Sequence, residues 1–232
     1  MLCVMNDARA DRDAGHLAEA QEYAKRFTAS LPDRIQIAAL TLKSKLPFKV
    51  LSIRELLLHR VAALSSAAVD LFAQKRVIPA VILTRAIVET LAVLFTLYER
   101  LDRFLKEEPK DIGAFDELLM RYLMGARNNP EMPTPTNIVT LIDRVEKTIP
   151  GFRQTYDSLC ECAHPNWAGM FGAFGEVDRE NFELKLRPTE KSFAYSTGLA
   201  ALSISLKLFE HYYNNSADLV HKINDYFEGL PT

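Results

Sequence analysis

Arg85 and Glu89 are the residues of this chain whose types and spacing point most directly to chemistry. They are the only ionisable side chains before Tyr98 in the stretch VIPAVILTRAIVETLAVLFTLY, residues 77–98. A spacing of four places both on one face of a helix. Charges in such surroundings are costly unless they are paired or hydrogen-bonded. We expect the pair either to lock helix register or to serve a site. In such a site Arg85 would hold an anion and Glu89 would act as a base, a metal ligand or the group that orients a histidine.

The segment CECAHPN, residues 160–166, is the best candidate to meet this pair. Pro165 disfavours continued helix, so His164 is predicted at a helix end, where its imidazole could act as a general acid or base. Asn166 offers a donor and an acceptor, while Tyr156 and Trp167 could reach or wall the same pocket. The alternative is structural: a helix stop with His164 hydrogen-bonded to nearby backbone and Asn166 in a turn, while Tyr156 lies in the core and Trp167 packs under the hairpin.

Metal and cofactor sites have weaker support. Cys160, Cys162 and His164 have C-x-C-x-H spacing, which differs from the usual paired zinc ligands. Glu161-x-x-His164 matches half of a di-iron carboxylate motif, but no second E-x-x-H occurs. The sequence also lacks a P-loop, a G-x-G-x-x-G and a G-x-S-x-G motif. We therefore expect no metal and no cofactor.

Composition excludes several functional classes. The chain has 232 residues with a formal net charge of −2. Its overall charge therefore does not favour binding to nucleic acid or to an anionic membrane. Three cysteines do not make a disulfide framework and fit a reducing cytosol. No signal peptide is evident. The apolar stretch is long enough to span a bilayer, but Arg85 and Glu89 near its centre oppose insertion. We expect a cytoplasmic protein without membrane contact.

The pattern of apolar residues, prolines and glycines predicts an all-α multi-helix bundle in a single domain, 1–232. It divides into N-terminal helices (1–46) and a core bundle (48–228) with a small β-hairpin insertion near residues 170–187. Asp33 is expected to cap a helix over 35–46, and Ser52 with Glu55 to form a capping box for the next helix. Asn214–Asn215 is expected to break the last long helix. Because a lone hairpin is marginal in water, it should lie on the helices.

Two segments carry a resemblance to a known group of proteins. LTRAIVET (83–90) and YDSLCECAHPNWAG (156–169) resemble a family of uncharacterised bacterial helical proteins with an Arg-x-x-x-Glu helix and a His-Pro-Asn segment. The helical layout is similar to that of the HEPN superfamily, whose members include RNA-cleaving proteins. HEPN nucleases carry Arg-x(4–6)-His on one helix. The formal match here is Arg9 to His16, in a polar N-terminal segment, whereas Arg85 and His164 could meet only through tertiary packing.

Two classes of function follow from these observations. In the first, Arg85, Glu89 and His164 form a polar pocket for a small anionic ligand or, in a HEPN-like metal-independent ribonuclease, for RNA. In the second, the abundant apolar helix surface makes the chain a homodimeric interaction or scaffold module of a stress or phage-defence system.

Overall fold

The computed structural model describes residues 2–188 and 193–230 and confirms an all-α bundle with one small β-hairpin. Within these residues the helices are α1 (Leu2–Ala29), α2 (Leu46–Ala73), α3 (Val77–Lys106), α4 (Ile112–Met124), α5 (Ile138–Glu146), α6 (Phe152–Ala163), α7 (Phe171–Phe174) and α8 (Phe193–Glu228), with a single 3₁₀ turn η1 (Ile37–Ala39). Strands β1 (Gly175–Asp178) and β2 (Glu183–Leu186) form the hairpin.

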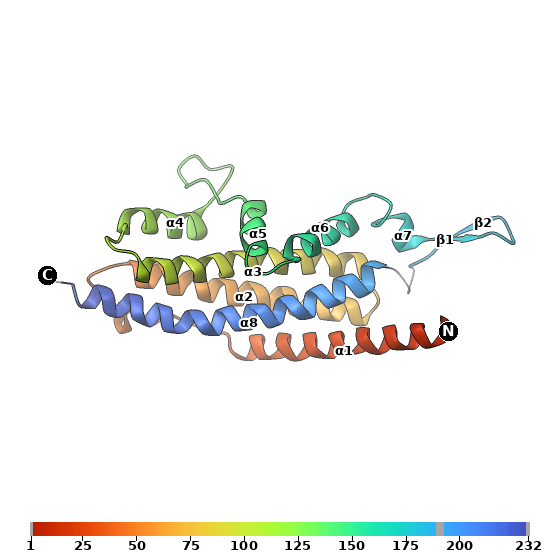
Figure 1. The fold of residues 1–232 in the computed structure, drawn as a ribbon, viewed down its shortest axis with the longest axis horizontal. Helices are drawn as coiled ribbons and strands as arrows, with labels where there is room; N and C mark the ends of the chain where they lie inside the picture. Colours follow the sequence, from red (N-terminus) through yellow and green to blue (C-terminus); the bar gives the residue numbers. More distant parts are fainter. Residues whose placement is uncertain (1, 189–192, 231–232) are drawn as a thin grey trace.

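The apolar helix α3 lies at the centre of an elongated molecule (Figure 1). Helices α2 and α8 pack along one side of it, and α1 covers α2 and α8 over part of their length. On the other side, α5 and α6 pack directly on α3, while α4 packs on α2. The functional candidates on α3 therefore lie under the layer formed by α4, α5 and α6.

The long helices form because their apolar residues recur at helical spacing and their ends carry suitable residues. Pro79 lies in the first turn of α3, where its missing N–H is harmless, and Asp111 caps α4 by accepting a hydrogen bond from the Ala114 backbone N–H at 2.9 Å. Two clusters of buried side chains make up the core. One comes from α1, α2, α3, α5, α6 and α8, and the other from α2, α3, α4 and the C-terminal part of α8.

The segment between α1 and α2 differs from the prediction. The helix expected over 35–46 is absent except for η1, and α2 begins at Leu46 instead of after Pro47. Proline fits the first turn of a helix, so Pro47 begins α2 where we expected it to end a helix. The capping box of Ser52 and Glu55 is wrong as well, because both residues lie inside α2.

Helix α8 is also longer than expected. It runs through Asn214–Asn215 without interruption, and Ser216 is buried with its hydroxyl donating to the Tyr213 carbonyl oxygen at 2.7 Å. Helix packing outweighs the weak intrinsic preference of asparagine for turns.

The hairpin forms where the sequence predicted it, but its expected position on the helices is wrong. All four residues of β2 are exposed. The hairpin projects beyond the end of the bundle (Figure 1). Its strands are antiparallel, with Val177 opposite Leu184 and Glu176 opposite Lys185.

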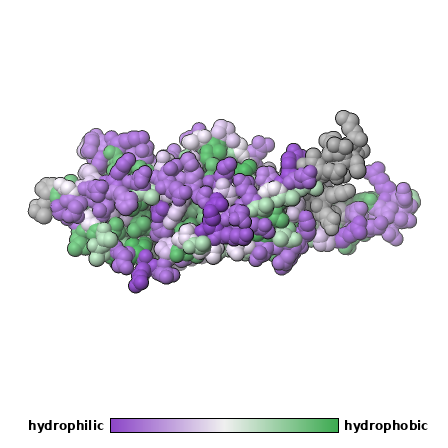
Figure 2. Space-filling view, turned by 90° about the horizontal axis from the view of Figure 1, so that it is seen from below, coloured by the Kyte–Doolittle hydropathy of each residue, from purple (hydrophilic) through white to green (hydrophobic). Residues whose placement is uncertain are grey.

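Helices α2 and α3 are long and apolar enough to cross a membrane by length and composition. Buried core helices of soluble proteins meet the same criterion, and half of the apolar window of α3 is buried inside this protein. On the face that carries α1, hydrophobic residues gather toward the C-terminal end, while the hairpin end is mainly hydrophilic (Figure 2).

Candidate functional site

Tyr156 on α6 is the residue that meets the charged pair of α3. Its hydroxyl donates to Glu89 Oε1 at 3.0 Å and accepts from Arg85 Nη2 at 3.3 Å. The Arg85 Nε atom lies 3.2 Å from the same Glu89 oxygen. Within the described residues, both contacts of the Glu89 carboxylate use Oε1, which leaves Oε2 without a hydrogen bond.

The charged pair is less buried than its apolar sequence context suggested. The Arg85 and Glu89 side chains are 32% and 26% exposed, because they lie at the border between α3 and α6 and not in the centre of the core. The pair is therefore neither fully withdrawn from water nor fully solvated. Because both side chains keep contact with water, their charges cost less free energy than fully buried ones. The pair therefore does not need a further partner such as His164.

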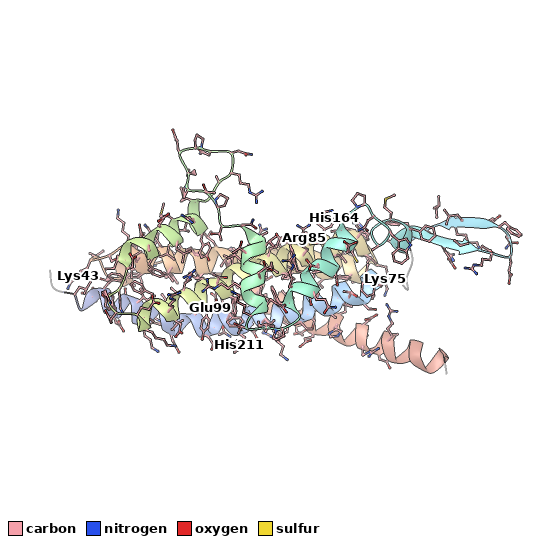
Figure 3. The ribbon with its side chains drawn as sticks, turned by 45° about the horizontal axis from the view of Figure 1, so that its top comes forward. Lys43, Lys75, Arg85, Glu99, His164 and His211 are labelled. Atoms are coloured by element: carbon pink, nitrogen blue, oxygen red, sulfur yellow. The ribbon has the colours of Figure 1, made fainter. Side chains whose placement is uncertain are left out.

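His164 lies apart from this cluster. It is the C-terminal cap of α6, and its side chain is exposed. Figure 3 shows it at the end of α6 nearer the hairpin, with Arg85 on the adjoining α3. His164 follows Tyr156 by eight residues, roughly 12 Å along a helix axis. In the described part of the chain, no hydrogen bond or ion pair joins His164 to Arg85 or Glu89.

Asn166 and Trp167 have local structural roles. Asn166 Oδ1 accepts from the Ala168 and Gly169 backbone N–H groups at 3.1 and 3.2 Å, and its Nδ2 donates to Glu161 at 2.6 Å. The Trp167 side chain is 72% exposed. These contacts match the structural alternative, in which Asn166 forms the turn that follows α6.

Cysteine chemistry has no support near this turn. Cys160 and Cys162 are free, and burial raises the pKa of the Cys162 thiol, which disfavours the reactive thiolate. Among the described side chains, no group of three or more His, Cys, Asp and Glu is arranged to hold a metal ion.

Glu89 also lines a cavity on the side of α3 that faces α4 and α5. This Glu89 cavity has a volume of about 310 Å³. Its wall is mainly apolar and comes from α2, α3, α4, α5 and the loop before α5: Leu57, Arg60, Glu89, Thr90, Val93, Arg121, Tyr122, Gly125, Pro135, Thr136, Ile138 and Leu141.

Two residues that line the Glu89 cavity have hydroxyl groups that are buried without a partner. The Tyr122 hydroxyl and Thr136 Oγ1 are inaccessible to solvent and make no hydrogen bond. Burial raises the pKa of Tyr122 to about 12, so its hydroxyl remains protonated at neutral pH. An unsatisfied buried hydroxyl is uncommon in a native structure. The charges that act on the Tyr122 hydroxyl are those of Arg100, Arg144 and Glu99, which do not line the cavity.

Two arginines border the same cavity with unused donors. Arg60 donates from Nε to Thr90 at 3.1 Å, and Arg121 contacts Glu117 through Nη2. Each guanidinium carries five N–H donors, so both keep free N–H groups. Sequence reasoning missed these residues, because they come from separate helices whose arrangement only the tertiary packing sets.

A second polar cluster, also missed from the sequence, joins α2 to α8. Arg54 forms an ion pair with Glu55, and its guanidinium lies 3.6 Å from the centre of the Tyr213 ring. The Tyr213 hydroxyl donates to Glu55 Oε2 at 2.7 Å, and Arg54 Nε contacts Ser216 at 3.1 Å. The signal was present in the sequence, since Arg54 and Glu55 interrupt the apolar run of α2.

This second cluster adjoins a cavity of about 410 Å³ beneath residues 30–40. Arg54 and Glu55 face each other with side chains only 12% and 11% exposed, and their polar atoms are largely satisfied within the protein. Burial, together with the hydrogen bond to Glu55, raises the pKa of Tyr213 well above its usual value. The arrangement is that of a structural cluster that fixes α2 against α8.

The phenol of Tyr156 should make stability depend on alkaline pH. Burial raises its pKa to about 12, above the ordinary value of 10.0. Because the folded state keeps the proton more tightly, its stabilising contribution is complete below pH 10 and is lost as the pH rises toward 12. We expect Tyr156→Phe to reduce the fall in unfolding free energy over that range, measured by urea unfolding. An unchanged slope would contradict this assignment.

Comparison with known proteins finds no matching family model, no matching curated protein and no matching solved structure. The resemblance to HEPN-like helical proteins therefore stays a prediction.

Proposed function

We propose that the protein binds a small organic anion in the Glu89 cavity. The observation that carries the proposal is a largely apolar cavity bordered by the free guanidinium donors of Arg60 and Arg121. Guanidinium groups bind carboxylates and phosphates through paired N–H donors, and this suits an anionic head group.

The rest of the cavity narrows the class of ligand. Its volume of about 310 Å³ lies at the lower end of the range for small-molecule sites. Leu57, Val93 and Leu141 provide apolar wall for a hydrophobic body. The free Oε2 atom of Glu89 would accept a hydrogen bond from the ligand. An apolar hydroxy or amino acid satisfies all three features.

Calorimetric titration with phenyllactate tests the proposal. Phenyllactate should bind more tightly than phenylpropionate, which lacks the hydroxyl, and phenylethylamine should not bind. Arg60→Ala and Arg121→Ala should each weaken phenyllactate binding about tenfold or more, because each removes a charge-assisted hydrogen bond. Lys25→Ala is the matched control, because it removes one exposed positive charge on α1, which does not line the cavity.

Two outcomes would overturn this function. One is the absence of binding by phenyllactate and phenylpropionate to the wild-type protein. The other is equal affinity in wild type, Arg60→Ala and Arg121→Ala, which would place the ligand elsewhere.

Tyr122→Phe should separate stability from binding. In the free protein it removes a buried hydroxyl that has no partner, so the free energy of unfolding should rise by about 1 kcal/mol. Phenyllactate binding should stay near that of wild type in the same variant, because the charges near this hydroxyl, those of Arg100, Arg144 and Glu99, lie outside the cavity lining. Tyr156→Phe is the contrast, because it removes a hydroxyl with two partners and should destabilise the fold. Destabilisation by Tyr122→Phe would show that its hydroxyl is already satisfied.

A further inference from the structure

The hairpin of β1 and β2 has one charged face and one apolar face. In the observed register, Val177 faces Leu184 across the strands and Gly175 faces Leu186, so these residues share one face. Glu176, Asp178, Glu183 and Lys185 occupy the other. The apolar side chains are open to solvent: Val177 is 56% exposed, Leu184 50% and Leu186 79%.

This apolar face is unusual for an isolated hairpin. Two strands alone are marginally stable in water, and more strands or a covered hydrophobic face are needed. The hairpin projects from the bundle, away from the helices (Figure 1). Exposed aromatic side chains flank it, including Phe174 and Phe193, which are 44% and 63% exposed. Several large apolar side chains are thus exposed at this end of the molecule, and exposed apolar surface is a common feature of interaction sites.

The charge of the hairpin argues against a polyanionic occupant. Residues 175–187 contain four acidic and three basic side chains. Binding to nucleic acid or to an anionic membrane requires a positive excess, which this segment lacks. The occupant should instead present apolar side chains with balanced charge, as another copy of the same hairpin does.

The outer edge of β2 is complementary to itself. When two copies of β2 pair antiparallel about Leu184, that leucine faces its own equivalent, and Glu183 of each copy faces Lys185 of the other, whose ammonium also pairs with Asp178 of its own hairpin at 2.7 Å. Opposite charges across strands are favourable, and like charges are unfavourable. The same pairing of two β1 edges about Val177 would set Glu176 against Asp178, which is repulsive. Electrostatic interactions therefore favour pairing of two β2 edges over pairing of two β1 edges.

We infer that two copies of this chain associate by antiparallel pairing of their β2 edges, giving a four-stranded sheet in the order β1–β2–β2–β1. Within the described residues, β2 makes no backbone hydrogen bond on its outer edge, so the donors and acceptors for this pairing are available. The sheet unites the apolar faces of both hairpins into one surface. The inference does not depend on the anion-binding function of the Glu89 cavity.

Complementary charge reversal tests this inference. Sedimentation of the wild-type chain across the micromolar range should show a monomer–dimer equilibrium. In a dimer of Glu183→Lys, the new lysine of each copy faces Lys185 of the other copy. In a dimer of Lys185→Glu, the new glutamate of each copy faces Glu183 of the other copy. Each variant should dimerise about tenfold or more weakly than wild type, because two attractive pairs become repulsive. A mixture of the two variants should form a heterodimer near wild-type affinity, because both cross-copy pairs are again of opposite charge.

Glu180→Lys is the matched control, because it reverses a charge in the turn of the hairpin without changing β2. It should dimerise like wild type. A strictly monomeric wild type would overturn the inference. So would a dimer that neither reversal weakens, or two weakened variants whose mixture fails to recover, because each outcome places association elsewhere.

Discussion

Replacing Glu55 with alanine is expected to lower the free energy of unfolding by about 3 kcal/mol, because removing one partner of a buried ion pair leaves the other charge uncompensated. The Glu55 side chain is 11% exposed, and it contacts both Arg54 and the Tyr213 hydroxyl. Its loss would leave the guanidinium without a counter-ion and the phenol without its acceptor. Guanidinium-induced unfolding followed by circular dichroism provides the measurement.

The matched control for this prediction is Glu22→Ala. Glu22 pairs with Lys25 on the surface of α1, where both side chains are mostly exposed, so its loss should leave the free energy of unfolding nearly unchanged. An equally small effect of Glu55→Ala would show that α2 and α8 do not depend on this cluster. Tyr213→Phe should give an intermediate loss, because it removes a single hydrogen bond.

Replacing Gly125 with alanine is expected to destabilise the protein by about 2 kcal/mol through steric conflict with backbone. Gly125 ends α4 and lines the Glu89 cavity. A Cβ atom there would lie 2.4 Å from the Arg121 carbonyl oxygen and 2.8 Å from Pro135 Cα. Neither atom belongs to a flexible side chain, so the loop before α5 must shift.

The same substitution should weaken phenyllactate binding, because Pro135 and Thr136 of this loop form part of the cavity wall. Gly113→Ala, at the start of the same helix, is the control. Its Cβ would have one neighbour within 4 Å, the Asp111 carboxylate at 3.7 Å, so alanine should stabilise α4 by up to about 1 kcal/mol. Thermal unfolding with and without phenyllactate distinguishes the two variants, and equal melting temperatures would contradict the prediction.

The sequence predicted the elements whose signals are local. The apolar length of α3 and the stop of α6 before Pro165 are each determined by neighbouring residues. Pro47 was ambiguous, since proline follows one helix as readily as it begins another. The uninterrupted helix through Asn214–Asn215 depends on packing against distant segments, which no local pattern contains.

The candidate site also has one part that local sequence predicts and another that depends on tertiary packing. The proximity of Arg85 and Glu89 follows from helical spacing alone, and the two side chains form an ion pair in the structure. Which residue of α6 meets the pair depends on how α6 lies along α3, and here Tyr156 takes that position while His164 lies beyond it. The Glu89 cavity draws on several elements, so Arg60, Arg121 and Tyr122 could not be grouped before the tertiary arrangement was known.

The distance between the hairpin and the far end of α8 has a practical consequence for handling the protein. Helix α8 ends at Glu228, at the end of the molecule opposite the hairpin, whereas α1 begins near the hairpin (Figure 1). A fluorescent protein fused after residue 232 would sit remote from the projecting strands, while one fused before residue 1 would crowd them. Comparing the two fusions would show directly whether bulk at that end interferes with self-association.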